Sequence, residues 1–260
     1  MAIGEAKTIC RYYCNMKFLK NIAGRLMAVW AMLSFMLSFL LIFIPAMMTW
    51  LIPDPKGQGI FIRIARIWMR IWLPLVGCPL KVKGEEYFEK GQSYIVTCNH
   101  NSLMDIPISC PFIPGPNKTI AKSSFVKVPL FGFYYMKGSV IVNRNSEQSR
   151  RSSYDKMKAV LKKGMHMSVY PEGTRNRTNE PLKKFHDGAF RLATETGTAI
   201  IPAVIFNTRK VLPAGKGLWF IPHRLEMHFL PPVEAINKTT EQLKEEVFRI
   251  MQDHYTGKLN

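Results

Sequence analysis

The chain is short of acidic residues: its 260 residues include 18 Asp and Glu against 36 Lys and Arg, a formal net charge of +18. With 47% hydrophobic residues it is globular rather than disordered. The basic excess favours an anionic partner, such as nucleic acid, an anionic membrane or a phosphorylated substrate. No run of adjacent basic residues exceeds two, and zinc-finger and RNA-binding signatures are missing. We therefore expect no nucleic-acid partner.

Cysteine is also scarce, and its pattern excludes two kinds of site. The five cysteines are odd in number and form no CxxC pair; they are Cys10, Cys14, Cys78, Cys98 and Cys110. This argues against both a disulfide framework and a zinc site. We expect free thiols in a reducing compartment, and no bound metal.

One long stretch has no charged residue. It runs from Leu26 to Ile52 and, as a helix rising about 1.5 Å per residue, exceeds the about 30 Å of hydrocarbon in a bilayer. It is too long for the apolar part of a signal peptide. We expect an uncleaved membrane anchor over residues 1–56.

The orientation of this anchor is less determined. Basic residues flank it on both sides, so the positive-inside rule does not select a direction for a single crossing. Pro45 interrupts the run and is compatible with a kink or a turn. A segment that enters the bilayer and returns is preferred here to a tilted single span, and it leaves the rest of the chain on the cytoplasmic face.

Residues 57–75 predict an amphipathic helix. Arg63, Arg66 and Arg70 recur at helical spacing among isoleucines and tryptophans, which is typical of a helix in the headgroup layer. The alternative is an ordinary helix that faces the core and carries a solvated basic stripe.

From residue 76 to 260 short β-rich runs alternate with helical ones. The expected strands are Leu80–Lys83, Tyr94–Cys98, Thr119–Lys122, Ser139–Asn143, Met167–Tyr170, Ile200–Phe206 and Glu226–Leu230. The expected helices are Ser146–Lys163, Phe185–Thr196 and Thr240–His254. This alternation predicts an α/β sandwich, with a largely parallel or mixed central sheet flanked by helices, preceded by the membrane-embedded helical segment.

The first cluster of chemically capable residues follows the strand at Cys98. His100 and Asp105 are not on one helical face, but they can meet if His100 ends the strand and Asp105 begins the next turn. A carboxylate bonded to one imidazole nitrogen fixes the tautomer and raises the basicity of the other, which suits a general base. The alternative is a capping box formed by Ser102 and Asp105.

The second cluster, Tyr170–Arg175, follows a later strand. Gly173 permits a tight turn, while Thr174 and Arg175 offer a hydroxyl and a planar guanidinium that suit a phosphate. A simple turn with a solvated arginine is the alternative.

Together the two clusters resemble the glycerolipid acyltransferase family, whose best-known branch acylates 1-acylglycerol-3-phosphate (lysophosphatidate). The resemblance covers about residues 76–230. It includes two weaker blocks, formed by Lys122, Pro129, Gly132, Gly138 and Arg144, and by the apolar strand around Pro202.

The resemblance implies a role for each matching residue. His100 is the general base, and Asp105 orients it. The residues expected to bind the acceptor phosphate are Glu172, Gly173, Thr174 and Arg175, with Lys122 and Arg144 as helpers. Pro202 is expected to shape the acyl-donor or acyl-chain site. The hydroxyl attacks the thioester of acyl-CoA or acyl carrier protein directly, with no further cofactor, no metal and no acyl-enzyme.

Some positions depart from the family pattern, and other functions remain open. Ser123-Ser124-Phe125 stands where many members have an acidic residue and Leu, which leaves acceptor and donor specificity open. His186 and Asp187 could form a second catalytic pair, although a polar cluster at a helix N-terminus is preferred. Alternatives to phosphatidate synthesis are another lyso-lipid or hydroxyl acceptor, or a non-enzymatic basic membrane protein that binds anionic lipid.

Overall fold

The computed structural model describes residues 2–143, 146–178 and 180–258. Its helices are α1 (Ala2–Met48), α2 (Lys56–Leu75), α3 (Asp105–Ser109), α4 (Phe131–Lys137), α5 (Glu147–Lys162), α6 (Gly188–Thr196), α7 (Thr208–Val211) and α8 (Thr240–Gly257). Its strands are β1 (Leu80–Lys83), β2 (Ile95–Cys98), β3 (Asn117–Lys122), β4 (Ser139–Val142), β5 (His166–Val169), β6 (Ile200–Phe206) and β7 (Leu225–Phe229). Short 3-10 turns include η1 (Thr49–Leu51), η3 (Cys110–Phe112) and η4 (Ser123–Lys127).

The strands form one mixed sheet in the order β1-β7-β6-β2-β5-β3-β4. The five strands from β6 to β4 are mutually parallel, whereas β7 is antiparallel to β6 and parallel to β1. The central strands β2, β5 and β6 are buried along their whole length. Strand β6 is a continuous apolar run, as expected for a strand buried on both faces, whereas β2 and β5 include the buried polar residues Thr97, His166 and Ser168. The expected mixed α/β sandwich is confirmed.

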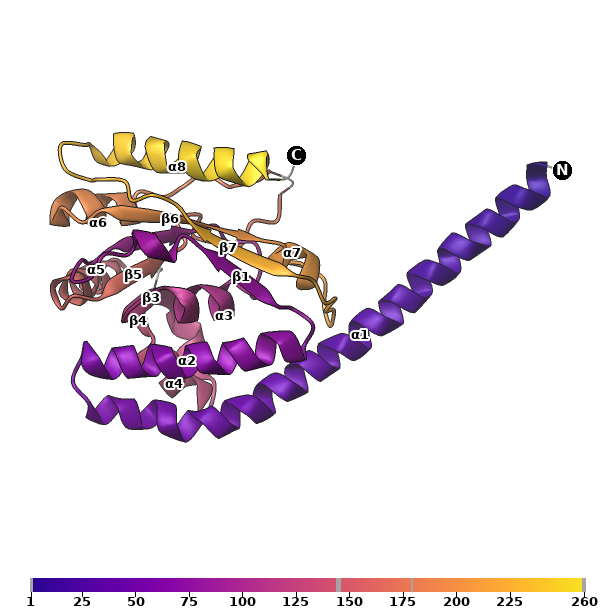
Figure 1. The fold of residues 1–260 in the computed structure, drawn as a ribbon, viewed down its shortest axis with the longest axis horizontal. Helices are drawn as coiled ribbons and strands as arrows, with labels where there is room; N and C mark the ends of the chain where they lie inside the picture. The colour runs from indigo at the N-terminus through magenta and orange to yellow at the C-terminus, as the bar shows by residue number, and fades with distance from the viewer. Residues whose placement is uncertain (1, 144–145, 179, 259–260) are drawn as a thin grey trace.

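Helices cover both faces of the sheet (Figure 1). On one face α5, α6 and α8 pack against Ile95, Ile200 and Val204. On the other face α1 and α2 pack against Val96, Ile201 and their neighbours. The two faces therefore take alternate residues of the same strands, as the pleat requires.

The expected elements match the structure closely. Leu80–Lys83 and Ile200–Phe206 coincide with β1 and β6, and the other strands differ by one or two residues at an end. The helices expected to end at Lys163 and Thr196 end at Lys162 and Thr196, and the glycines that follow, Gly164 and Gly197, have the positive φ of a left-handed cap. The capping box of Thr239 and Gln242 is also formed.

The N-terminal region differs from the expected return within residues 26–52. Helix α1 continues through Pro45 to Met48, and the chain reverses only at residues 49–55. The returning arm is α2, which packs along the C-terminal part of α1 (Figure 1). The apolar stretch is thus one continuous helix up to Met48, and the amphipathic helix α2 packs against it in antiparallel orientation.

Helix α2 has one face in the protein interior. Trp68, Met69 and Trp72 are buried in the same core cluster as the sheet. Arg66 is half-buried and donates hydrogen bonds to the carbonyl oxygens of Pro111 (2.6 Å) and Ile113 (2.8 Å), whereas Arg63 and Arg70 are exposed. The basic stripe is therefore divided: Arg66 stabilises η3, and the other two arginines face outward.

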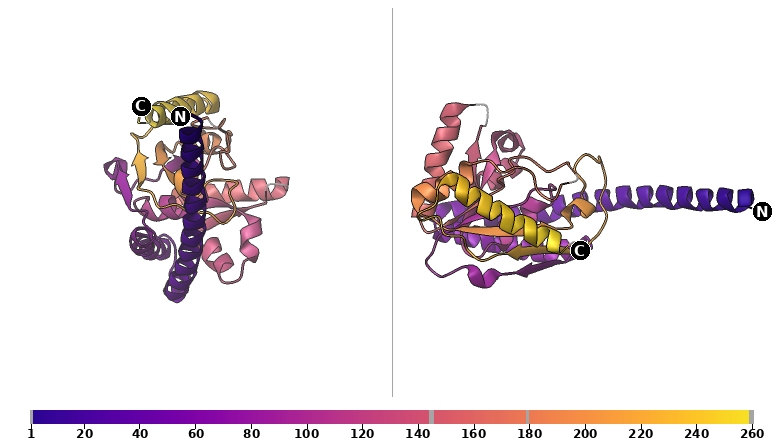
Figure 2. Two further views of the ribbon diagram at one scale, coloured as in Figure 1. Left: turned by 90° about the vertical axis from the view of Figure 1, so that its right-hand side faces the viewer. Right: turned by 90° about the horizontal axis from the view of Figure 1, so that it is seen from above.

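One stretch among the described residues, Phe18–Leu51, is long and apolar enough to cross a membrane. Its N-terminal part projects beyond the body of the protein (Figures 1 and 2). Only 22% of its most apolar window is buried, so most of this helix presents apolar side chains outward, which is consistent with membrane association.

Candidate active site

The candidate site lies where the parallel strands end. Since β2, β3, β5 and β6 are parallel, their carboxyl ends meet at one edge of the sheet. Ligands of open α/β sheets bind in the crevice at this edge. His100 follows β2, Glu172 follows β5, Lys122 ends β3 and Arg209 follows β6. The topology thus brings together side chains that are far apart in the sequence.

His100 and Asp105 form the expected pair. His100 Nδ1 lies 2.8 Å from Asp105 Oδ2, and the His100 side chain is only 14% exposed. The imidazole also packs on the ring of Tyr170, with ring centroids 4.4 Å apart. Because Nδ1 is held by the carboxylate, the other ring nitrogen, Nε2, is left for proton transfer.

Asp105 is held rigidly by the loop that precedes it. Its Oδ2 also accepts backbone N–H bonds from Asn101 (2.6 Å) and Ser102 (2.7 Å), and the side chain is fully buried. Asp105 begins α3, but the residue in the capping position is Met104. Half of the alternative capping box is formed, because Asp105 accepts the Ser102 N–H, whereas the Ser102 hydroxyl accepts the N–H of Met104 instead of that of Asp105.

Glu172 clamps the two motif loops together. Its Oε1 accepts the backbone N–H of His100 at 2.7 Å, and its Oε2 accepts that of Lys183 at 3.1 Å. The side chain is 1% exposed, and burial raises its pKa although these two hydrogen bonds oppose the rise. Both carboxylate oxygens accept backbone N–H groups of the protein. Glu172 therefore supports the loops and does not have the donor groups with which a phosphate would be bound.

The rest of this motif forms a turn at the surface. Gly173 has a φ of +69°, and a Cβ there would lie 2.8 Å from the His186 ring. Thr174 accepts a hydrogen bond from Lys183 Nζ at 2.7 Å. Arg175 is half-buried, and its guanidinium makes no hydrogen bond or ion pair to any residue that the structure describes. The turn thus carries a hydroxyl, an ammonium and a guanidinium group, the residue types of an anion site, and its Asn176 N–H is bonded to the carbonyl of His100.

The remaining predicted residues are distributed unevenly. Lys122 is exposed at the same sheet edge, two strands from β2. Arg144 lies outside the described residues. Pro202 is buried in β6 opposite Thr97, whose hydroxyl contacts Met251 of α8. Pro202 therefore lies within the sheet on the α8 face, and is not grouped with His100.

Sequence reasoning missed Arg209, which links both motif loops. Its guanidinium donates to the carbonyl oxygens of Thr178 (2.8 Å) and Asn176 (3.0 Å), and it also reaches Asn101. Asn176 in turn donates its backbone N–H to the carbonyl of His100. Arg209 belongs to no motif, and only its position directly after an apolar strand could have indicated it.

Asn99 was also missed. Its side chain donates to the carbonyl of Ile205 at 2.9 Å and accepts the N–H of Ile205 at 2.7 Å. These two bonds extend the pairing of β2 and β6 beyond the end of β2, so the residue before His100 is fixed to the sheet.

Ser102 and Cys98 lie near His100 in the sequence, but the structure does not favour either as a nucleophile. The Ser102 hydroxyl is buried, donates to the carbonyl of Leu212 and accepts from the N–H of Met104. Burial raises the pKa of the Cys98 thiol well above its usual value, which disfavours the reactive thiolate. Asp187 precedes α6 and pairs with Lys244 at 2.7 Å, in agreement with a polar cluster at a helix N-terminus.

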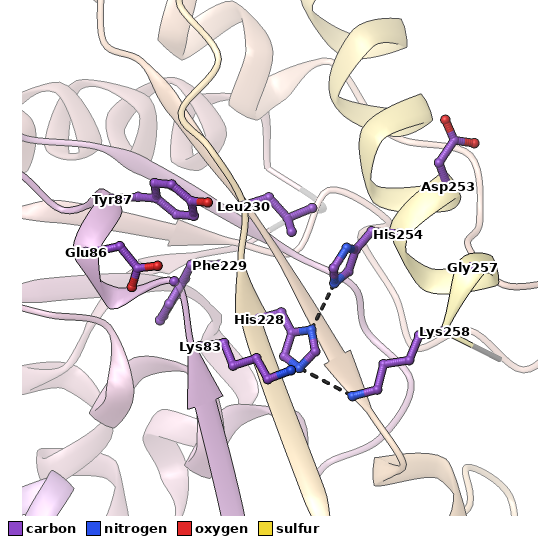
Figure 3. A pocket seen from close by; sticks show the side chains of 11 residues that line it. Lys83, Glu86, Tyr87, His228, Phe229, Leu230, Asp253, His254, Gly257 and Lys258 are labelled. Atoms are coloured by element: carbon purple, nitrogen blue, oxygen red, sulfur yellow. Dashed lines mark hydrogen bonds between the residues drawn. The ribbon is translucent and has the colours of Figure 1, made fainter.

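A separate cavity of about 700 Å³ lies between the ends of β1 and β7 and the end of α8 (Figure 3). There His228 Nδ1 lies 2.9 Å from His254 Nε2, and Lys258 reaches His228 from the same helix end. None of the cavity residues belongs to the candidate site. Among the residues that the structure describes, no group of three or more His, Cys, Asp or Glu could hold a metal ion.

Comparison with known proteins identifies the family. The acyltransferase family model matches residues 79–206. The chain is 30% identical to the 1-acyl-sn-glycerol-3-phosphate acyltransferase of Borreliella burgdorferi over 204 residues, which are 75% of this chain and 77% of that protein. It is also 30% identical to the enzyme of that name from Saccharomyces cerevisiae over 184 residues, 70% of this chain and 60% of the yeast protein.

A solved structure has the same fold. The 1-acyl-sn-glycerophosphate acyltransferase of Thermotoga maritima superposes with a TM-score of 0.76 at 22% identity, over 92% of this chain and 97% of that one. The matched length includes the N-terminal helices as well as the sheet. Taken with the sequence relatives, these matches place the chain: it belongs to the acyltransferase family that includes the 1-acyl-sn-glycerol-3-phosphate acyltransferases.

Proposed function

We propose that this protein transfers a fatty acyl group from acyl-CoA or acyl carrier protein to the free hydroxyl of 1-acylglycerol-3-phosphate, which forms phosphatidate. The names of its relatives support the acceptor and the product. The observation that carries the proposal is the His100–Asp105 pair, 2.8 Å apart, in a loop whose His100 carbonyl is bonded to the turn that carries Thr174 and Arg175. A general base next to an anion site suits a phosphorylated acceptor with a free hydroxyl.

In the proposed mechanism, His100 Nε2 takes the proton of the acceptor hydroxyl as its oxygen attacks the thioester carbonyl. The tetrahedral intermediate then collapses, the carbon–sulfur bond breaks, and His100 returns the proton to the leaving thiolate. Asp105 accepts the Nδ1–H bond throughout and stabilises the imidazolium that forms. The reaction needs no cofactor besides the acyl thioester.

The acceptor phosphate binds at the exposed turn after Gly173 in this proposal. Thr174 and Arg175 contact the phosphate, Lys183 holds the Thr174 hydroxyl, and Lys122 adds positive charge at the same edge. Glu172 positions His100 through its backbone and does not touch the substrate.

The protein acts at a membrane in this proposal, with the sheet and its helices on the cytoplasmic face. The exposed apolar surface of α1 supports membrane attachment. An acceptor with a long acyl chain resides in the same bilayer, so attachment raises its local concentration near His100.

The test is acyl transfer by the purified protein in detergent micelles. His100→Ala removes the base, and we expect activity to fall by at least about 10³-fold, the order of magnitude lost when a catalytic triad member is removed. His223→Ala, a partly exposed histidine in a loop, is the matched control and keeps full activity. An active His100→Ala variant would refute the proposed base.

A second comparison tests the acceptor. The unaltered protein is expected to prefer lysophosphatidate over lysophospholipids without a phosphomonoester, and Arg175→Ala reduces this preference by raising KM for lysophosphatidate alone. Equal rates with both acceptors would refute the phosphate site.

A further inference from the structure

A surface lobe beside α1 has properties that the proposed chemistry does not require. The lobe comprises η4 and α4, residues Ser123–Lys137, and follows directly after Lys122. It packs on the apolar helix through aromatic side chains: Phe131 and Tyr134 lie 5.9 Å and 5.5 Å from the ring of Phe39. In two views the lobe lies alongside the C-terminal part of α1 (Figures 1 and 2).

The lobe is unusually apolar at its surface. Beyond residue 76, eight large apolar side chains are exposed among the described residues, and four of them lie within this lobe. They are Phe125, Val128, Leu130 and Phe133, the last of which is 58% exposed. Single exposed apolar residues are ordinary, but a cluster of them marks a surface that binds something.

The sequence around the lobe is basic, although the Asp54 carboxylate from the turn before α2 pairs with two of its cations, Lys118 and Lys137. Between Ile106 and Ser146 the sequence contains five basic residues and no Asp or Glu. Lys122 and Lys127, at the start and within the lobe, are exposed. Exposed apolar groups bordered by basic groups match the chemistry of an anionic bilayer surface, where each Lys or Arg near the headgroups contributes about 1 kcal/mol.

The lobe also has a defined shape. Gly132 packs so closely that a Cβ there would lie 2.1 Å from the carbonyl oxygen of Val126. Leu130 has a φ of +58°, which is uncommon for a residue with a side chain and is retained only where the surroundings enforce it. The exposed apolar residues therefore stand on a rigid support.

We propose that this lobe is a second membrane contact, separate from α1, and that it rests in the headgroup layer of an anionic bilayer at the sheet edge that bears His100. The bilayer is the occupant because the lobe continues the apolar outer surface of α1 and because its charge is basic. This contact holds the sheet edge that bears His100 against the bilayer, so the acceptor reaches the base directly from the lipid. The inference rests on the proposed function only for this last step.

The contact itself is measured with an environment-sensitive fluorophore on Phe133→Cys, in the full-length protein carrying Cys10→Ser and Cys14→Ser. Ile236→Cys is the matched control, because Ile236 is 62% exposed and lies outside the lobe, between β7 and α8. The probes are phosphatidylcholine vesicles with and without phosphatidylglycerol. We expect a blue shift at 133 on transfer from detergent to vesicles, larger with the anionic lipid, and none at 236.

Two outcomes would overturn the proposal. The first is an emission shift on transfer to vesicles that is absent at position 133, or that is equal at positions 133 and 236. The second is a shift at 133 that follows protein concentration in detergent without vesicles, which would mean that a second copy of the chain covers the lobe. Neither measurement depends on catalysis, so both remain informative if the proposed activity fails.

The consequence for substrate access is tested with serine at 125, 128, 130 and 133. These substitutions leave the packing residues Phe131, Gly132 and Tyr134 in place. We expect about a tenfold loss of rate on long-chain lysophosphatidate in vesicles, equivalent to about 1.4 kcal/mol, and an unchanged rate on a short-chain acceptor dispersed in water. An equal loss on both acceptors would contradict the role in access.

Discussion

At the scale of single residues, the proposed base His100 is positioned by groups to which the proposed mechanism gives no chemical step. Glu172 accepts two backbone N–H bonds from separate loops, and Arg209 donates to three groups from the same two loops. All of these interactions except the Glu172–Lys183 bond join residues that are about 30 to 110 positions apart. The His100 loop is thereby tied to the turn that presents Arg175.

Glu172→Gln tests this positioning role. A glutamine offers one acceptor oxygen, so its NH2 group must face the N–H of either His100 or Lys183 and one buried hydrogen bond is lost, at a cost of about 1–3 kcal/mol. We expect lower thermal stability together with a kcat reduced about tenfold or more. Glu180→Gln at an exposed position serves as the control. If the variant kept normal kcat and stability, the clamp would be unimportant.

The residue types of the site could be predicted from the sequence, but their partners could not. Motif spacing identified His100 and Asp105, because a strand end and a helix start limit where these two side chains can lie. It did not separate Glu172, which faces backbone, from Thr174 and Arg175, which face outward, although all three belong to one short motif. The side chains of adjacent residues in a tight turn point in different directions, and these directions depend on the backbone conformation of the folded chain.

At the scale of elements, hydrophobic pattern predicted the sheet better than the N-terminal hairpin. Strand β6 is an apolar run that ends before Asn207, and β1 alternates apolar residues with lysines between Pro79 and Gly84, so both were predicted to the residue. Pro45 was compatible with a turn, but it lies inside α1, where neighbouring apolar packing tolerates it. The reversal at residues 49–55 is instead held by Asp54, a tertiary contact without a local signal.

Asp54→Asn should loosen this hairpin. The Asp54 carboxylate lies 2.9 Å from Lys118 Nζ and 3.0 Å from Lys137 Nζ, and the Lys137 side chain is only 5% exposed. Burial would raise the pKa of Asp54, but hydrogen bonds and charge from the two lysines outweigh burial and lower it. The substitution leaves a buried ammonium unpaired, and we expect about 3 kcal/mol of destabilisation.

Denaturant unfolding in detergent measures this loss. The control is Glu147→Gln, which removes an exposed pair with Arg151 and costs less than about 0.5 kcal/mol. Because the folded pKa of Asp54 is lowered, the stabilisation is present above its ordinary pKa and declines as the pH falls through the folded value. Equal effects of the two substitutions would contradict the role of Asp54.

The start of β5 predicts a pH-dependent stability. Burial lowers the pKa of His166 to about 4, and its Nδ1 accepts the backbone N–H of Tyr94 at 3.0 Å, which requires the neutral ring. In the unfolded chain His166 binds a proton near pH 6.5. The contribution of the neutral ring to the stability of the fold is therefore complete above that pH, and it is lost as the pH falls towards 4. The slope is about 1.4 kcal/mol per pH unit within this window.

His166→Asn removes this titration while it keeps an acceptor for Tyr94. Urea midpoints measured from pH 4.5 to 7 should show a shallower decline for the variant than for the unaltered protein. His228 and His254 are present in both proteins, so their contribution cancels in the comparison. Parallel declines would show that His166 does not titrate in this range.

At the scale of the whole molecule, α1 is part of the protein core and also carries much of its exposed apolar surface. Phe35 of α1 lies 4.7 Å from Trp68 and 5.1 Å from Trp72, both buried residues of α2. Deletion of residues 2–55 would expose this apolar side of α2. We expect the truncated protein to aggregate in size-exclusion chromatography, with or without detergent, whereas deletion of residues 2–15 leaves a monodisperse protein in detergent. A soluble, active protein lacking residues 2–55 would contradict this.

The strand order has a consequence for synthesis on the ribosome. The central strand β2 pairs with β6, and β1 pairs only with β7, so neither pair can form until most of the chain has been made. Helix α1 is complete long before that, and helices form locally and fast. The nascent chain therefore presents its apolar helix while no sheet exists to cover it, and insertion into a membrane at that stage removes the exposed segment most prone to aggregation. Attachment would then precede folding of the sheet, and the sheet would fold next to the bilayer.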